Sequence, residues 1–112
     1  MFDLTNKTTL ITGACGLLGL KHAEAILEFG GEVILTDVIP TDDGIEIVNK
    51  LKEKYNTDKV TYEWMDVTSE SCIESIIDKY TKIDVLINNA ALDPKVEDGM
   101  EWKNKFENLE LE

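Results

Sequence analysis

The chain has 112 residues, of which 43% are hydrophobic and 30% charged, a size and composition typical of one soluble globular domain. Twenty-three acidic residues against eleven lysines, with no arginine, give a formal net charge of −12. Because nucleic acids and anionic membrane surfaces are polyanions, this charge excludes both as partners. Arginine is the side chain best suited to forked phosphate recognition, so any bound phosphate must be held mainly by backbone groups.

The chain has two cysteines far apart in sequence, no CxxC pair and a single histidine. This usage predicts neither a disulfide framework nor a metal site, and reduced thiols are typical of the cytoplasm. The longest uncharged stretch, residues 8–20, is too short and too rich in glycine to span a bilayer. We therefore expect a cytoplasmic protein with no bound metal and no membrane segment.

Strand and helix patterns alternate along the chain. Short runs rich in β-branched and apolar residues predict strands at 8–12, 33–36, 60–65 and 83–87.

Three helices are predicted between these strands. The first, over 17–29, carries Leu18 and Phe29 on its apolar side and stops at a pair of glycines. The second begins at an N-cap within 41–43, and a hydroxyl side chain at 68 or 69 caps the third.

The order βαβαβαβ with short connections predicts parallel strands joined by right-handed crossovers. This is a Rossmann-like α/β fold, part of a doubly wound parallel sheet with strand order 3-2-1-4. We assign residues 1–91 to this dinucleotide-binding unit. Residues 92–112, with seven acids and three lysines, are interpreted as an acidic loop or tail. The fourth strand is then an edge, which predicts a homo-oligomer or edge-strand pairing.

The first strand runs directly into a glycine-rich turn and then into a helix. In a dinucleotide loop, three glycines permit the tight turn, the approach of backbone N–H groups to pyrophosphate and close helix–strand packing. The phosphates then lie at the positive end of the helix. The alternative interpretation is a tight turn with no ligand. The candidate contacts in this turn are Gly13, Cys15, Gly16, Leu17, Leu18 and Gly19.

Carboxylates follow the second and third strands at the same edge of the predicted sheet. Asp37 can accept hydrogen bonds from both hydroxyls of a ribose, although an N-cap or a solvated strand end is the alternative for each acid. A carboxylate there repels a 2′-phosphate, and no arginine is available to neutralise one, so NAD is favoured over NADP. The candidate cofactor contacts here are Asp37, Val38, Asp66 and Val67.

With these features in place, the chain resembles the short-chain dehydrogenase/reductase family at Thr12-Gly13…Gly16…Gly19, Asp37, Asp66-Val67 and Asn88-Asn89-Ala90-Ala91. The resemblance implies that the glycine turn holds the pyrophosphate, Asp37 the adenosine ribose and Asp66-Val67 the adenine. It also implies that Asn88, Asn89, Ala90 and Ala91 close the floor of the cofactor site. Ala91 stands where the family usually has glycine.

The activity that the resemblance implies is hydride transfer between NAD and a hydroxyl or carbonyl group of a small-molecule substrate. Family catalysis uses a tyrosine and a lysine four residues later, with a serine and an asparagine, all beyond the fourth strand. We expect this 112-residue chain alone to be inactive because that region is absent from it. Tyr55 and Lys59 match the tyrosine–lysine spacing, but their place at the end of the second helix indicates a chance match.

Two other functions stay open. The spacing TGxxGxxG resembles the extended branch of the family rather than its TGxxxGxG members, which points to a nucleotide-sugar epimerase or dehydratase. Asn88-Asn89-Ala90 resembles the classical branch instead, so the branch stays open. The second alternative is a nucleotide-binding module without chemistry.

Two single residues have narrower interpretations. Cys15 is interpreted as a small residue that fits a crowded loop, and a thiolate stabilised by the helix N-terminus is the alternative. His22 is expected to be partly buried on the first helix.

Overall fold

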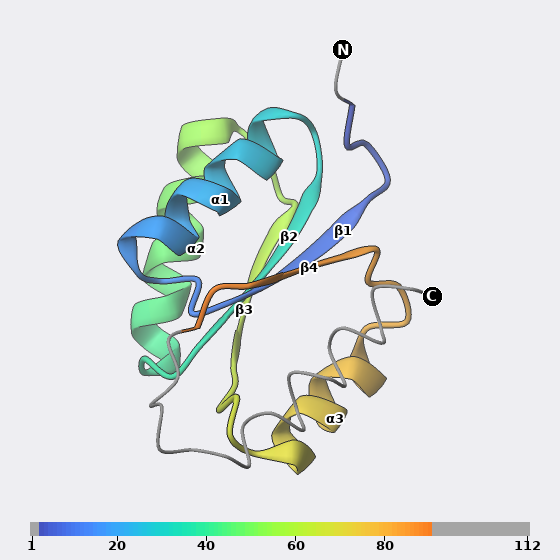
Figure 1. Ribbon diagram of the computed structural model, residues 1–112. Coiled ribbons are helices and arrows are strands. Elements are labelled where there is room, and N and C mark those ends of the chain that lie inside the picture. The colour runs from blue at the N-terminus through green and yellow to red at the C-terminus, as the bar shows by residue number, and fades with distance from the viewer. Residues whose placement is uncertain (1–2, 91–112) are drawn as a thin grey trace.

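The computed structural model describes residues 3–90, which form a four-stranded sheet flanked by helices (Figure 1). Ala91 and the predicted tail, 92–112, lie outside the described residues. The elements in chain order are β1 (Thr8–Thr12), α1 (Leu17–Glu28), β2 (Glu32–Asp37), α2 (Thr41–Tyr55), β3 (Val60–Trp64), α3 (Glu70–Lys79) and β4 (Val85–Asn88). All paired strands are parallel and their order is β3-β2-β1-β4, which confirms the predicted α/β architecture.

Helices cover both faces of the sheet. α1 and α2 lie on one face and α3 lies on the other (Figure 1). β1, in the middle of the sheet, is buried along its whole length. Its neighbouring residues Leu10 and Ile11 point to opposite faces, and both are 0% exposed. Because β1 is covered on both faces, apolar and β-branched side chains point to both of them, and no charged residue alternates with them.

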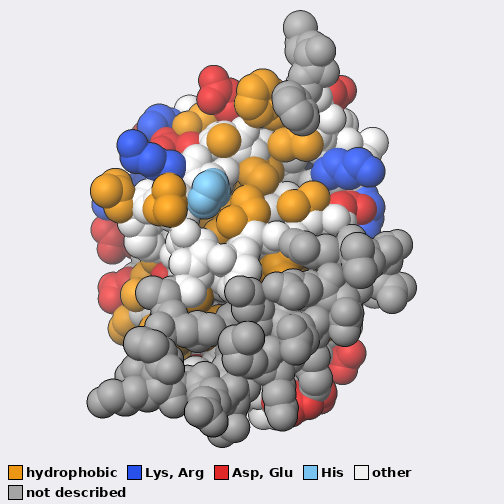
Figure 2. Space-filling view, in the orientation of Figure 1, with side chains coloured by type: hydrophobic (Ala, Val, Ile, Leu, Met, Phe, Trp, Pro, Cys, Tyr) orange, Lys and Arg blue, Asp and Glu red, His pale blue; other side chains and the backbone are white. Residues whose placement is uncertain are grey.

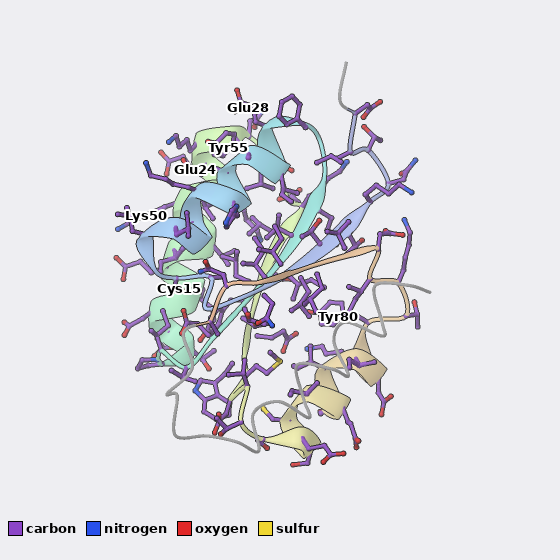
Figure 3. The ribbon with its side chains drawn as sticks, viewed as in Figure 1. Cys15, Glu24, Glu28, Lys50, Tyr55 and Tyr80 are labelled. Carbon is purple, nitrogen blue, oxygen red and sulfur yellow. The ribbon has the colours of Figure 1, made fainter. Side chains whose placement is uncertain are left out.

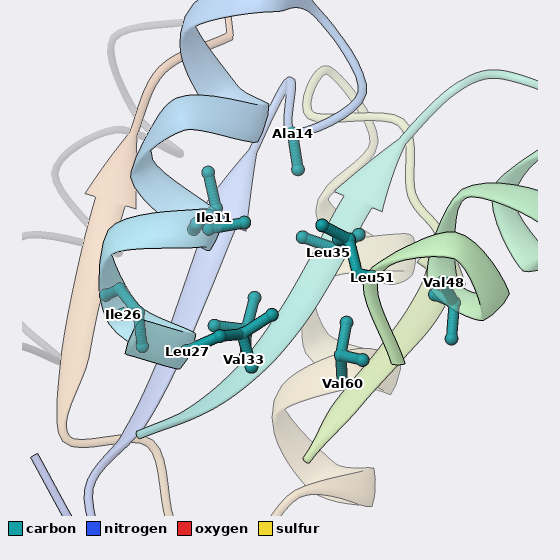
Figure 4. Close-up of a cluster of buried hydrophobic side chains, with 10 residues drawn as sticks. Ile11, Ala14, Ile26, Leu27, Val33, Leu35, Val48, Leu51 and Val60 are labelled. Atoms are coloured by element: carbon teal, nitrogen blue, oxygen red, sulfur yellow. The ribbon is translucent and has the colours of Figure 1, made fainter. Parts of the chain in front are cut away.

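Two hydrophobic clusters fill the spaces between the sheet and its helices. Burial of one Leu or Ile side chain contributes about 1.5–3 kcal/mol, so these clusters supply much of the driving force for folding. The cluster under α1 and α2 contains Ile11, Ala14, Ala23, Ile26, Leu27, Val33, Leu35, Val48, Leu51 and Val60 (Figure 4). The cluster under α3 contains Leu10, Ile34, Met65, Ile73, Ile76 and Leu86.

The structure corrects two expectations about α1 and β4. Leu18 and Phe29 are 58% and 44% exposed, so they are not part of the buried side of α1. Both lie near the ends of the helix, and helical periodicity does not show where the sheet beneath a helix stops. β4 covers Val85–Asn88 rather than 83–87.

The helix ends confirm two expectations and correct a third. Gly30 has a φ of +87° after α1, the left-handed conformation expected of a glycine stop. Ser69 caps α3 by accepting a hydrogen bond from the N–H of Cys72. The N-cap of α2 is Pro40, without a side-chain hydrogen bond, so the expected cap within 41–43 is wrong.

The described surface carries charges of both signs. On the face shown in Figure 2, lysines and acids lie around the margin and hydrophobic side chains gather nearer the middle. Within residues 3–90, none of the helices combines the length and the apolar character that a membrane span requires.

Candidate functional site

Two glycines of the β1–α1 turn are required by the packing of the protein itself. Gly13 has a φ of +60°, and a Cβ there would lie 2.8 Å from the Cα of Ala90. A Cβ at Gly19 would lie 2.6 Å from the carbonyl oxygen of Gly13 and 2.7 Å from the Cα of Ala14. Such contacts with backbone atoms force the chain apart, so these glycines hold α1 and the end of β4 close to β1.

Gly16 has no such packing reason. Its φ of −80° and ψ of 172° are extended values that any residue adopts. A Cβ there would be 3.7 Å from the carbonyl oxygen of Gly13, an ordinary van der Waals contact. The exposed backbone at Gly16 is therefore a surface that a side chain would fill and that a closely approaching ligand would need bare.

The N-terminus of α1 is open to an anion. The N–H groups of the first turn of a helix lack partners inside the helix and carry partial positive charge. The N-cap of α1 is Gly16, without a capping side chain, and its first turn holds no acidic residue. By contrast, the first turn of α2 contains Asp42 and Asp43, and Ser69 caps α3. Among the described helices, α1 is thus the one that best fits an external phosphate.

The Asp37 carboxylate lies against the glycine turn. Its Oδ2 accepts a hydrogen bond from the N–H of Cys15 at 2.9 Å, and its Oδ1 accepts one from the N–H of Val38 at 2.7 Å. The end of β2 is therefore tied directly to the turn after β1. The sequence predicts that these two segments lie at one edge of the sheet, but it does not reveal this hydrogen bond.

Thr12 joins the ends of β1 and β4. Its hydroxyl donates to Oδ1 of Asn88 at 3.1 Å and accepts from the N–H groups of Asn89 and Ala90, at 3.0 and 3.1 Å. The side-chain amide of Asn89 donates to the carbonyl of Gly13 at 3.1 Å. These bonds hold the segment after β4 against the glycine turn. The sequence places Thr12 next to Gly13 at the end of a predicted strand, but it does not reveal that this buried hydroxyl joins two strand ends.

The structure disfavours the alternative of a stabilised Cys15 thiolate. Partial burial, followed by the negative charge of Asp37, raises the pKa of Cys15 to about 11. Burial and the carboxylate that bonds to the Cys15 backbone therefore both oppose ionisation of its side chain. Cys15 is a neutral thiol at neutral pH.

Asp66 stabilises the turn before α3. Its Oδ1 accepts hydrogen bonds from the N–H of Thr68 at 2.9 Å and from the Thr68 hydroxyl at 2.7 Å. These donors lower the pKa of Asp66 from its ordinary value. The neighbouring Val67 packs against the cluster under α3. Both residues follow β3 at the same edge as Asp37, and both have a structural role there.

Tyr55 and Lys59 do not form a catalytic pair. The Tyr55 hydroxyl donates to Glu24 at 3.0 Å and joins α2 to α1. The Lys59 ammonium donates to the carbonyl of Gly30 at 3.3 Å, just before β2 begins. Figure 3 shows Tyr55 and Glu24 together, well away from Cys15 in the glycine turn. His22 is half-buried on α1, as expected.

Comparisons with known proteins agree with this geometry. A family model described as short chain dehydrogenase matches residues 7–111. Trans-4-hydroxycyclohexanecarboxylate dehydrogenase of Sinomonas cyclohexanicum is 28% identical, over 93% of this chain and 44% of that protein. The chain spans less than half the length of the curated relatives that it matches first.

Solved structures show the same fold. NADPH-dependent 3-quinuclidinone reductase from Rhodotorula rubra has a TM-score of 0.66 and 27% identity, over 95% of this chain and 42% of that one. An NADH-dependent reductase complexed with NAD has a TM-score of 0.71 at 23% identity, over 92% of this chain and 51% of that one. The match of the family model over most of the chain, together with the sheet order and the glycine turn, shows that the chain belongs to the short-chain dehydrogenase family.

Proposed function

We propose that these residues form the NAD-binding half of an oxidoreductase that transfers hydride between NAD and a hydroxyl or carbonyl group of a small molecule. The observation that carries the proposal is the hydrogen bond from Cys15 N–H to Asp37. It puts a carboxylate that can accept ribose hydroxyls beside the turn that can accept pyrophosphate. The bare backbone at Gly16 leaves room for that ligand.

The chain's own residues bind and orient the cofactor. The N–H groups at the start of α1 hold the pyrophosphate, and Asp37, with Val38 beside it, holds the adenosine ribose. Asp66 and Val67 border the adenine, and Asn88 to Ala90 form the floor near the end of β4. The nicotinamide, when bound, supplies the hydride acceptor. Within residues 3–90, Tyr55 and Lys59 are held elsewhere, so we propose that acid–base catalysis comes from other residues of the whole enzyme and that this chain alone is inactive.

We further propose that the cofactor is NAD rather than NADP. Related folds serve both cofactors, because one similar reductase is NADPH-dependent and another is complexed with NAD. In this chain, none of the four ion pairs found among residues 3–90 involves Asp37. A 2′-phosphate beside Asp37 would therefore meet an unneutralised carboxylate.

Titration of the full chain with NAD and NADP, by calorimetry, tests both proposals. We expect Asp37→Ala to weaken NAD by about tenfold or more, the loss typical of hydrogen bonds to a charged group, and to leave NADP nearly unchanged. Asp42→Ala, which removes an exposed carboxylate from the first turn of α2, is the matched control and should change neither affinity. Equal affinities of wild type and Asp37→Ala for both cofactors would contradict the role of Asp37.

The spacing of Gly13, Gly16 and Gly19 supports a second candidate, an epimerase or dehydratase that acts on a nucleotide sugar. The whole enzyme would then bind NAD in the same turn and require a nucleotide-linked substrate. Turnover of simple alcohols or ketones by the whole enzyme would exclude this candidate. Activity only with nucleotide-linked sugars would support it.

We propose that the free edge of β4 pairs with a further strand, in a second copy or elsewhere in the whole enzyme. β4 lies at one end of the described sheet, and Val85 there is 39% exposed. Sedimentation of the chain at increasing concentration tests pairing between copies. A monomer at all concentrations would exclude the homo-oligomer.

A further inference from the structure

The turn after β2, residues 37–39, is held by two side chains of β3 that donate hydrogen bonds to its carbonyl groups. The Trp64 indole N–H donates to the carbonyl of Val38 at 3.2 Å. The Tyr62 hydroxyl lies 2.7 Å from the carbonyl oxygen of Ile39 and 3.0 Å from that of Asp37, and shares its proton between them. Three successive carbonyls of the turn 37–39 thus face two aromatic side chains of one neighbouring strand.

These contacts begin where the sheet stops supplying partners. The last backbone bond between the two segments runs from Met65 N–H to the carbonyl of Asp37, at 2.9 Å. Beyond it, Pro40, the N-cap of α2, has no N–H. Backbone groups of β3 no longer pair with the turn there, and the Tyr62 and Trp64 side chains take their place.

The Tyr62 ring is itself fixed by α2. A Cβ at Gly44 would lie 2.3 Å from the ring, so Tyr62 fills the space that this helical glycine leaves open. Burial, with smaller contributions from Cys15 and nearby acids, raises the pKa of Tyr62 to about 12. The hydroxyl therefore remains a donor across the physiological pH range.

The turn that these aromatics hold carries the Asp37 carboxylate. That carboxylate is already oriented by the N–H groups of Cys15 and Val38. A rigid turn keeps it where it accepts the 2′- and 3′-hydroxyls of a ribose. To admit a 2′-phosphate, the turn would have to move away, and this would break the bonds from Tyr62 and Trp64.

We propose that Tyr62 and Trp64 are positioning residues that set the preference for a free 2′-hydroxyl over a 2′-phosphate by fixing the turn 37–39. This inference rests on the proposed NAD-binding function. It concerns residues that do not touch the cofactor and act through the backbone of the turn. If Tyr62 and Trp64 had a purely structural role, their substitution would weaken the binding of NAD and NADP by the same factor. The ratio of the two affinities therefore distinguishes the two roles.

The test is titration of Tyr62→Phe with NAD and NADP, using the full chain. The variant keeps the ring against Gly44 and removes only the hydroxyl. We expect NAD affinity to fall about five-fold, the effect of one lost hydrogen bond, while NADP affinity falls less, so that the preference narrows. Trp64→Phe should act in the same direction.

Tyr55→Phe is the matched control, because its hydroxyl bonds to Glu24 and Tyr55 is the last residue of α2, at the opposite end of that helix from this turn. It should leave both affinities unchanged. If wild type prefers NAD and both β3 variants keep that preference at full strength, the positioning role is wrong while the proposed function stands. If wild type binds neither cofactor, the proposed function fails and the inference fails with it.

Discussion

The turns that lead into α1 and α3 leave the same edge of the sheet, yet their backbone groups are satisfied in opposite ways. Before α3, Asp66 accepts hydrogen bonds from Thr68, and Ser69 caps the helix. Before α1, the turn is built of glycines, the N-cap has no side chain, and the carboxylate that reaches it comes from β2.

The turn before α3 satisfies its backbone N–H groups with its own side chains, whereas the turn before α1 leaves N–H groups that fit a ligand. The turn before α3 contains its own hydrogen-bond acceptors, so an added anion would form few new hydrogen bonds there. The α1 turn presents first-turn N–H groups without a local acceptor, and Gly16 leaves the approach clear. Both strand ends are typical of the fold, but these contacts favour only the first as a phosphate site.

The largest effect is expected from a side chain at the tightest point of the α1 turn. Gly19→Ala forces a Cβ against backbone atoms 2.6–2.8 Å away. The free energy of unfolding should fall by about 3 kcal/mol, and cofactor binding should be lost with the geometry of the turn. Urea denaturation measures the change. A loss below about 0.5 kcal/mol would show that the turn is not packed as described.

Gly16→Ala adds the same methyl group as Gly19→Ala, but at a position where the protein has room for it. We expect unfolding free energy within about 1 kcal/mol of wild type, since alanine is a poorer N-cap than glycine. NAD should bind about tenfold more weakly or worse, because the methyl group occupies the approach to the backbone. Denaturation and calorimetry on the same sample separate the two effects. Unchanged NAD affinity would remove Gly16 from the site.

Ser69→Ala removes the side-chain oxygen that caps α3. Loss of the N-cap should lower the unfolding free energy by about 1 kcal/mol and leave NAD affinity unchanged. Ser75→Ala, at an exposed position within α3, is the control and should cost less. A clear loss of NAD binding in Ser69→Ala would mean that the α3 turn also serves the cofactor.

The smallest effect concerns acid. The Thr68 donors hold the pKa of Asp66 below its ordinary value of 3.8. The stability that Asp66 contributes is therefore complete above pH 3.8 and is lost as the pH falls through its lower value in the folded state. In urea denaturation at falling pH, the free energy of unfolding should decrease less steeply for Asp66→Asn than for wild type. Asp78→Asn, at an exposed α3 position, should keep the wild-type slope; identical slopes for all three proteins would contradict the assignment.

Much of the fold followed from local patterns. The β-branched run of β1 and the alternation of helix and strand patterns predict the sheet order, because parallel crossovers allow few arrangements. Gly30 and Ser69 were predicted as helix ends for local reasons as well. The predicted place of Leu18 on the buried side of α1 is wrong, because its exposure depends on where the sheet beneath the helix stops. That is a property of the tertiary structure.

The candidate site was predicted in outline but not in its contacts. The spacing of the glycines and the place of Asp37 after a strand were visible in the sequence. The bond from the Cys15 N–H to Asp37 spans two strand ends, and burial together with the Asp37 charge raises the pKa of the Cys15 thiol. The bonds of Tyr62 and Trp64 to the turn 37–39 depend on the register of β3 against β2, which local sequence does not give.

The most direct test of the account follows backbone amide resonances by NMR while NAD is added to the full chain. We predict that the N–H signals of the first turn of α1, 17–19, shift most, because those groups meet the pyrophosphate. The signals of Glu70 to Cys72 at the start of α3 should stay nearly unchanged. Largest shifts at α3, or no shifts at either turn, would contradict the claim that the α1 turn is the phosphate site.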